Sequence, residues 1–167
     1  GRVDVPEALE DGFFPNRMRQ AGYYAVNRVK TDYNVSGEHE RFWDASSRRA
    51  HYRDRPEGSP FFAVFNFTGS HESNMFLDVL QEQPLTDPDA VEVPPYHPDL
   101  PEIRRSWAHN YDRVAELDEW VDEQLRELRL EGLDENTIIV YYADHGGVLP
   151  RSKRFMYHTG TAVPLLV

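Results

Sequence analysis

An aspartate and a histidine lie side by side near the C-terminal end of the sequence, and both can bind metal or move protons. Asp144 and His145 directly follow an apolar run at residues 137–143, and two glycines come next. Such a run predicts a strand buried on both faces of a parallel sheet, and ligands bind at the carboxyl ends of these strands. A carboxylate beside an imidazole suits metal binding or acid-base chemistry. The alternative is a simple turn that the Asp144 side chain caps.

Only two of the eighteen basic residues are lysines, and both are candidate ligands for an anion. Where arginine is so strongly favoured, a lysine suggests a need for a compact point charge. Lys30 follows a short apolar segment at residues 23–26, so it lies near the end of a predicted strand. Lys153 lies in the loop after the two glycines. The alternative is that both are ordinary surface lysines.

A further candidate, His71, follows a segment that is apolar almost throughout, residues 60–67. This segment predicts a second buried strand, with polar and titratable residues just beyond its end. The alternative is a structural histidine without a chemical role. Because the carboxyl ends of parallel strands meet at one edge of a sheet, we expect Lys30, His71 and the pair Asp144–His145 to converge there.

The N-terminal half of the chain is predicted to contain these first two strands and short helices. A helix begins at Pro6 and ends before Gly22. Residues 35–59 are polar, and they predict a loop with one short helix from about Glu40 to Ala50.

The C-terminal half contains the longest predicted helix. Residues 81–101 hold six prolines, which exclude a helix, and this connection either lines a substrate cleft or crosses the surface. From about Glu102 to Leu130, apolar residues recur at spacings of three and four, and acidic residues predict a solvated opposite face. With a strand on either side, this helix completes a βαβ unit of an α/β fold.

The composition limits the kinds of partner. A length of 167 residues fits one domain, and a net charge of -11 disfavours nucleic acid and anionic membranes as partners. An anionic substrate therefore requires a local cationic pocket. No apolar run approaches the roughly 20 residues that span a bilayer. The absence of cysteine excludes disulfides, thiolate metal sites and a cysteine nucleophile within this sequence.

Several groups of residues occur in an order and spacing that is more specific than any one of them. They are Tyr111-Asp112-x5-Asp118, Leu133-x2-Asn136-Thr137-Ile138 leading to Asp144-His145-Gly146, and Tyr157-x2-Gly160-x3-Pro164-Leu165. Together they resemble the catalytic domain of the sulfatases in the alkaline phosphatase superfamily. The loop at residues 147–153, with residues 160–164, is most similar to the heparan N-sulfatase (N-sulfoglucosamine sulfohydrolase) branch and its bacterial relatives.

This resemblance implies a fold and an activity. The fold is α/β, an alkaline-phosphatase-like, largely parallel central sheet flanked by helices, present here as a partial domain. The implied activity is hydrolysis of a sulfuric ester or sulfamate on a sulfated glycan such as heparan sulfate. The family also implies a secreted, periplasmic or lysosomal protein. The sequence does not indicate which sulfate position is cleaved.

The resemblance also assigns roles to the candidate residues. Asp144 corresponds to a ligand of the single divalent cation, usually Ca²⁺, which polarises the sulfate. His145 stands where many members have asparagine, and it is the weaker candidate because Ca²⁺ prefers oxygen ligands. Lys153 and His71 are implied to contact sulfate oxygens, and His71 also to protonate the leaving atom. Lys30 matches the lysine of a Lys-x-His motif that contacts sulfate and nucleophile.

Two family features differ or are missing. Asp32 stands at the histidine of Lys-x-His. The Cys/Ser-x-Pro/Ala-x-Arg motif, which provides the formylglycine nucleophile, and the paired aspartates before it do not occur in the sequence. We therefore expect residues 1–167 to be the central part of one catalytic domain, without its nucleophile region and C-terminal subdomain, and to be inactive alone.

Two alternatives remain open. A phosphatase or phosphodiesterase of the same superfamily shares the sheet and a metal site, but normally has more Asp and His residues for a second metal. A module that binds sulfated glycans without catalysis would have lost the nucleophile altogether.

Overall fold

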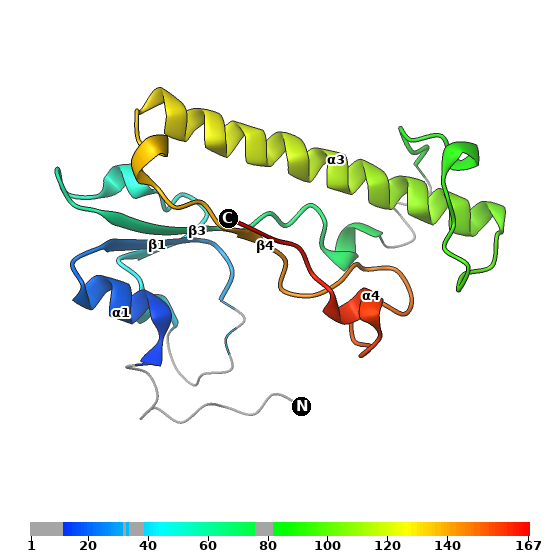
Figure 1. The fold of residues 1–167 in the computed structure, drawn as a ribbon, viewed down its shortest axis with the longest axis horizontal. Helices are drawn as coiled ribbons and strands as arrows, with labels where there is room; N and C mark the ends of the chain where they lie inside the picture. The colour runs from blue at the N-terminus through cyan, green and yellow to red at the C-terminus, as the bar shows by residue number, and fades with distance from the viewer. Residues whose placement is uncertain (1–11, 32, 34–38, 76–81) are drawn as a thin grey trace. The chain divides into compact units, whose positions relative to one another are not determined.

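The computed structural model describes residues 12–31, 33, 39–75 and 82–167, in two compact units. The first unit comprises residues 1–66 and the second comprises residues 67–167. Figure 1 shows the fold as a ribbon coloured along the chain. The predicted start of the first helix at Pro6 lies outside the described residues, as does Asp32.

The first unit contains a three-stranded parallel sheet. β1 (Tyr24–Arg28) lies between β2 (Ala45–Ser46) and β3 (Phe61–Phe65), and all its pairings are parallel. The prediction of an α/β fold with a parallel sheet is thereby confirmed.

The segment before β2 differs from its prediction. A short helix from Glu40 to Ala50 was expected, but a 3-10 turn at His39–Phe42 is followed by the strand β2. The Asp44 backbone N–H donates to the Ala25 carbonyl oxygen at 2.8 Å, and the Ala25 N–H donates to the Asp44 carboxylate at 2.8 Å. The open edge of β1 thus binds this segment, because exposed strand N–H and C=O groups need partners.

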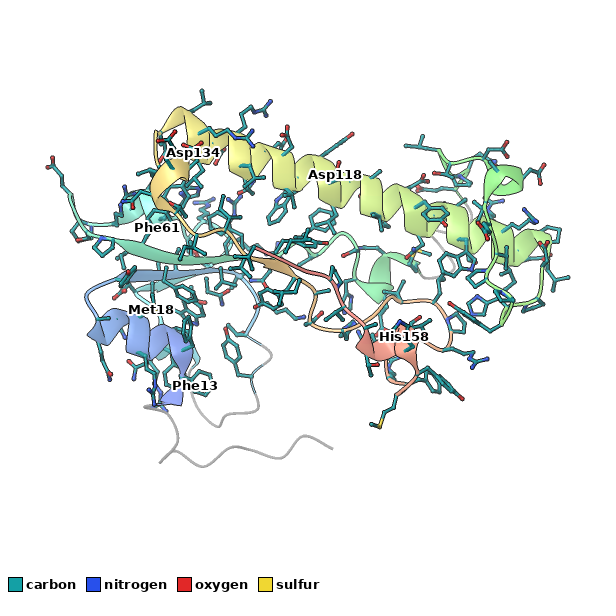
Figure 2. All side chains as sticks on the ribbon, viewed as in Figure 1. Phe13, Met18, Phe61, Asp118, Asp134 and His158 are labelled. Carbon is teal, nitrogen blue, oxygen red and sulfur yellow. The ribbon has the colours of Figure 1, made fainter. Side chains whose placement is uncertain are left out.

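Helix α1 (Phe14–Gln20) packs on this sheet through aromatic residues. Pro15 occupies its first turn, and Gly22 has a φ of 88° just after its end. The core cluster of this unit consists of Ala25, Phe42 and Trp43. Partly buried hydrophobic residues pack against it, among them Phe13, which directly precedes the helix (Figure 2).

The second unit is organised along helix α3 (Pro101–Leu130), which confirms the predicted long helix. Its apolar face lines a groove with the short antiparallel strands β4 (Tyr141–Tyr142) and β5 (Leu165–Leu166). The strand predicted at residues 137–143 is therefore wrong in length and in environment. Its ladder extends over two residues only, so Ile138 is 84% exposed rather than buried.

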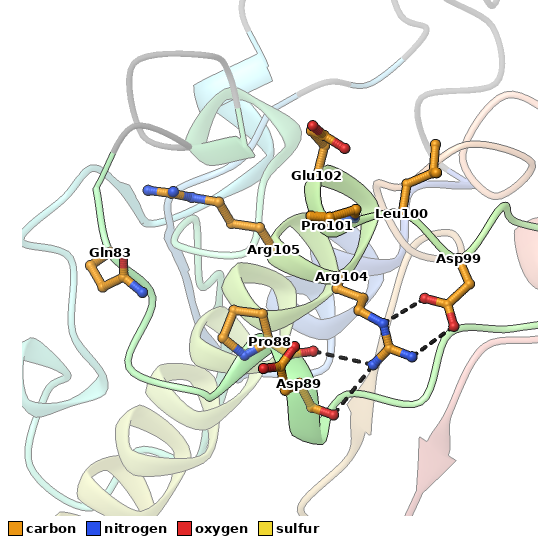
Figure 3. Close-up of a pocket in the computed structure, with 9 residues that line it drawn as sticks. All are labelled: Gln83, Pro88, Asp89, Asp99, Leu100, Pro101, Glu102, Arg104 and Arg105. Carbon is orange, nitrogen blue, oxygen red and sulfur yellow. Dashed lines mark hydrogen bonds and ion pairs between the residues drawn. The ribbon is translucent and has the colours of Figure 1, made fainter.

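The proline-rich connection is fastened to the first turns of α3. Arg104 donates from Nε and Nη2 to the Asp99 carboxylate at 2.5 and 2.7 Å, and from Nη1 to the carbonyl oxygen of Asp89 at 3.3 Å (Figure 3). Nη1 also donates to the carbonyl oxygen of Val91 at 3.0 Å. The connection contains one 3-10 turn, Pro88–Ala90. A pocket of about 470 Å³ lies here, and because Arg104 is saturated by its partners, we interpret the arginine as a structural clamp.

One acidic residue of α3 departs from the predicted solvated face. Asp112 is only 7% exposed, and its carboxylate accepts from the Leu85 and Thr86 N–H groups at 2.9 Å and from the Thr86 hydroxyl at 2.6 Å. Burial alone would raise the pKa of Asp112, but these hydrogen bonds outweigh it and lower the pKa. The carboxylate therefore anchors the proline-rich connection.

The remaining elements are short. They are the 3-10 turns Tyr52–Asp54, Glu72–Met75 and Asp134–Asn136, and helix α4 (His158–Thr161). No described helix is long and apolar enough to cross a bilayer.

Candidate functional site

Lys30 follows β1, where a buried amide holds its backbone. The Asn27 Nδ2 donates to the Lys30 carbonyl oxygen at 2.9 Å, and the Lys30 N–H donates to Asn27 Oδ1 at 3.3 Å. Asn27 is fully buried, and it also contacts Ser46 on β2 and Asn66 just after β3 at 3.2 and 3.1 Å. The loop of Lys30 is thus anchored to the ends of all three strands.

Asp144 and His145 face each other across a short gap in the second unit. The distance from His145 Nε2 to Asp144 Oδ1 is 3.7 Å. His145 Nδ1 lies 2.8 Å from the carbonyl oxygen of Gly146, and a carbonyl only accepts, so Nδ1 carries a proton. In the neutral ring, the lone pair is therefore on Nε2, the nitrogen that lies 3.7 Å from the Asp144 carboxylate. Two electron-pair donors this close to each other suit a cation.

His71 has the opposite arrangement of its ring nitrogens. The Ser73 N–H donates to His71 Nδ1 at 3.2 Å, and the Ser73 hydroxyl oxygen lies 2.8 Å from the same nitrogen. A nitrogen that accepts a backbone N–H is not protonated, so the proton resides on Nε2. The His71 side chain is exposed and therefore offers an Nε2–H donor.

Lys153 lies in a loop that two glycines hold in place. The Lys153 N–H donates to the Gly147 carbonyl oxygen at 2.9 Å, and the Gly146 N–H donates to the Gly160 carbonyl oxygen at 3.0 Å. A Cβ on Gly160 would lie 2.2 Å from the Phe155 carbonyl oxygen, and one on Gly146 would lie 1.9 Å from a backbone oxygen. Both positions therefore require glycine for packing reasons.

Two arginines in this loop adopt a left-handed backbone. Arg151 has a φ of 67° and Arg154 a φ of 74°. Residues with a side chain seldom adopt this conformation, and strained backbone tends to occur at functional sites. Ser152, between the first arginine and Lys153, is buried at 7% exposure and supports the loop from inside.

A glutamate next to His71 joins the two predicted anion-binding segments. Glu72 Oε1 lies 3.4 Å from Lys153 Nζ and 2.6 Å from Arg154 Nη2. Partial desolvation would raise the pKa of Glu72, but the charges of Arg154 and Lys153 outweigh it and lower the pKa. The His71 turn and the Lys153 loop are therefore in direct contact.

The structure thus brings together some predicted site residues and leaves others untested. His71 and Lys153 meet through Glu72, and Asp144 and His145 lie side by side. Lys30 belongs to the other unit, so its convergence with them stays a prediction. Within the described residues, no three His, Asp or Glu side chains gather closely enough to hold a metal alone.

Sequence reasoning missed Glu72 and Asn27. Glu72 could have been selected because it directly follows the candidate residue His71. Asn27 gave a weaker indication, as a polar residue at the end of an apolar segment. Both residues act through neighbours that are distant in the sequence.

Comparison with known proteins identifies the family. The sulfatase family model matches residues 13–167. The chain belongs to the sulfatase family. It is 35% identical over 184 residues to an ulvan-active sulfatase of Formosa agariphila, a match that covers 90% of this chain and 31% of that sulfatase. It is also 37% identical over 81 residues to the human N-sulphoglucosamine sulphohydrolase, covering 48% of this chain and 16% of the human protein.

These matches confirm the predicted sulfatase resemblance, including that to the N-sulfoglucosamine sulfohydrolase branch. The chain spans less than a third of the length of either relative.

Proposed function

We propose that this chain contributes part of the active site of a sulfatase that hydrolyses a sulfuric ester or sulfamate on a sulfated glycan. The observation that carries the proposal is the Glu72 ion pair, through which the turn after His71 contacts the loop of Lys153. This contact supports a common site for His71 and Lys153, two side chains that were predicted separately from the sequence. The names of the two relatives, an ulvan-active sulfatase and an N-sulphoglucosamine sulphohydrolase, support a glycan substrate.

Lys153 provides a positive charge for a sulfate oxygen in this proposal. Its side chain is 19% exposed, so its charge acts in a partly desolvated environment where electrostatic interactions are stronger. Donors fixed before the reaction stabilise the charge that develops on the transferred group. The glycines on either side of the loop provide that fixation.

His71 acts as a hydrogen-bond donor to sulfate in this proposal. Its Nε2–H is available in the tautomer that accepts the Ser73 N–H. Protonation of a leaving atom needs a second proton on Nδ1, and the Ser73 hydroxyl oxygen, 2.8 Å from Nδ1, can accept from that N–H. The surroundings of His71 are thus compatible with both roles expected from the family.

Asp144 and His145 fit part of a cation site. A carboxylate oxygen and an imidazole lone pair converge there, and Ca²⁺ takes about six to eight ligands, mostly oxygens. We propose that Asp144 is a ligand of one divalent cation, and that His145 is a second, weaker ligand. The remaining ligands would come from outside these 167 residues. When bound, a divalent cation would polarise the sulfate as a Lewis acid.

The nucleophile also comes from outside these residues in this proposal. The formylglycine motif of the family does not occur between residues 1 and 167. Lys30, held by the buried Asn27, would contact the sulfate and this nucleophile. Residues 1–167 would then form the central part of one catalytic domain and would not turn over substrate without the nucleophile.

The proposal is tested by Lys153→Ala in the full-length natural protein. We expect sulfate release from a sulfated glucosamine to fall by about a hundredfold or more, as when an oxyanion donor is removed. The melting temperature should stay close to that of the wild type, because Lys153 makes one ion pair at the edge of the loop. Arg126→Ala, on an exposed position of α3, is the control.

Near-normal turnover in Lys153→Ala would contradict the assignment. Turnover of a phosphate ester but not of a sulfate ester by the wild type would favour the phosphatase. Binding of sulfated glycan without any turnover would favour the non-catalytic module.

A further inference from the structure

Three cations, Arg151, Lys153 and Arg154, lie within four consecutive residues of the Lys153 loop. Lys153 and Arg154 share the Glu72 carboxylate. Among the described residues, no acidic side chain pairs with Arg151, although the chain has a net charge of -11. An arginine without a counter-charge in so acidic a chain suggests a binding role.

The Arg151 guanidinium is nevertheless held in place by aromatic rings. Its Cζ lies 4.4 Å from the centroid of the Tyr157 ring and 5.3 Å from that of the Tyr96 ring. At these distances the guanidinium charge is attracted to the ring faces, and the N–H groups that do not face the rings can bind an anion. The ring contacts therefore preorganise the group without consuming its donors.

The backbone at Arg151 is fixed as well. The Thr159 hydroxyl donates to the Arg151 carbonyl oxygen at 2.5 Å, and His97 Nε2 lies 3.0 Å from the carbonyl oxygen of the preceding Pro150. Arg151 keeps a left-handed φ of 67°, which glycine would adopt more easily. A charged residue retained at a strained position points to a function of its side chain.

We propose that Arg151 binds a second anionic group of the glycan, next to the sulfate that is cleaved. This inference rests on the proposed function. Arg151 and Lys153 are two residues apart, so their Cα atoms are within about 7 Å of each other. Two anion-binding positions this close would take two anionic groups of one glycan chain. A planar guanidinium edge suits the two oxygens of a carboxylate or of a sulfate. The preferred substrate is thus a polyanionic chain rather than a singly sulfated sugar.

The test uses Arg151→Gly and Arg151→Asn in the full-length protein. Both residues tolerate a left-handed backbone, so both variants should fold with a melting temperature close to that of the wild type. Three sulfated disaccharides are compared: one with a neighbouring uronate, the same compound with the carboxyl group reduced to an alcohol, and one with a second sulfate instead. Arg126→Gln removes the same charge from an exposed position of α3 and is the control.

We expect kcat/KM, mainly through KM, to fall about tenfold or more for a substrate with the second anion, and to change little for the reduced compound. A loss confined to the uronate compound identifies the anion as a carboxylate, and a loss confined to the doubly sulfated compound identifies it as a sulfate. An equal loss on all three, or no loss on any, would overturn the inference.

Equilibrium binding of the same disaccharides, measured by calorimetry, separates this inference from the proposed function. If the wild type binds them but releases no sulfate, the proposed function fails, while the affinities of wild type and Arg151→Gly still decide the role of Arg151. If Arg151→Gly binds the second-anion compounds as tightly as the wild type does, the inference is wrong.

Discussion

The two lysines of this chain are held by different means. Lys30 is fixed by Asn27, a fully buried amide that hydrogen-bonds to the lysine backbone on both sides. Lys153 lies in a loop shaped by close-packed glycines, and its ammonium pairs with the partly exposed Glu72. The backbone of the first lysine is held by buried neutral hydrogen bonds, whereas the loop of the second is held by backbone packing and its ammonium by charge.

This difference predicts different failures. A buried amide whose partners are removed costs the desolvation of each unpaired group, so a defect there lowers the stability of the unit. A loop formed by close backbone approach loses its shape when one methyl group is added, while the rest of the unit keeps its structure. Charge at the surface responds to pH and to salt, and a buried amide does not.

The largest effect on activity is expected from Gly160→Ala. The added Cβ would lie 2.2 Å from the Phe155 carbonyl oxygen and 2.4 Å from that of Ser152, so the loop must shift. We expect a loss of about a hundredfold or more in sulfate release by the full-length protein, because a displacement of about 1 Å has that effect on catalysis. Unfolding should become easier by about 1–3 kcal/mol, as for other overpacked sites.

Gly12→Ala is the control, because no atom of the described residues lies within 4 Å of the Cβ that would be added there. If Gly160→Ala keeps full activity, the close packing does not determine the position of Lys153.

Asn27→Ala is expected to lower the stability more than Gly160→Ala does. It removes the amide that contacts the backbone of Lys30, the Ser46 hydroxyl and the Asn66 side chain. Denaturant unfolding should show a loss of about 2–4 kcal/mol, the cost of unpaired buried polar groups and a small cavity.

Asn136→Ala replaces an exposed asparagine and should change the unfolding free energy little. A similarly small change in the unfolding free energy of Asn27→Ala would contradict the distinction between the ways in which Lys30 and Lys153 are held.

Of the three substitutions, Glu72→Gln is expected to have the smallest effect on stability, and this effect depends on pH. The folded-state pKa of Glu72 is lowered, so its ion pairs stabilise the folded protein above the unfolded pKa of about 4.5. This contribution is lost as the pH falls through the lower, folded pKa. The difference in melting temperature between wild type and Glu72→Gln should thus be present at neutral pH and vanish in acid.

Glu123→Gln, at an exposed position of α3, should show no such trend. A difference that persists unchanged in acid or in high salt would mean that Glu72 acts by packing rather than by charge.

The elements that local sequence patterns specify were predicted well. The apolar runs gave β1 and β3, and the spacing of apolar residues gave α3 to within one residue at its start. The two-residue strand Ala45–Ser46 was missed, because its formation depends on the open edge of β1 and not on its own composition. The strand predicted at residues 137–143 was too long, because the pattern of apolar residues does not specify the length of the strand with which it pairs.

The candidate site was predicted residue by residue, but its connections were not. The types and positions of His71 and Lys153 were enough to select them. Their contact passes through Glu72, whose second partner, Arg154, is 82 positions away, and no local pattern reports such a pair. The left-handed conformation of Arg151 was equally hidden, since arginine gives no indication of a positive φ.

The opposite tautomers of His71 and His145 make the two rings distinguishable by nitrogen NMR. In the neutral rings, the hydrogen bonds of their neighbours leave the lone pair on Nδ1 of His71 and on Nε2 of His145. Titration of the protein with Ca²⁺ should therefore perturb the Nε2 resonance of His145, and inorganic sulfate should perturb the Nε2–H resonance of His71. One spectrum thus reports separately on the cation and the anion, without any turnover.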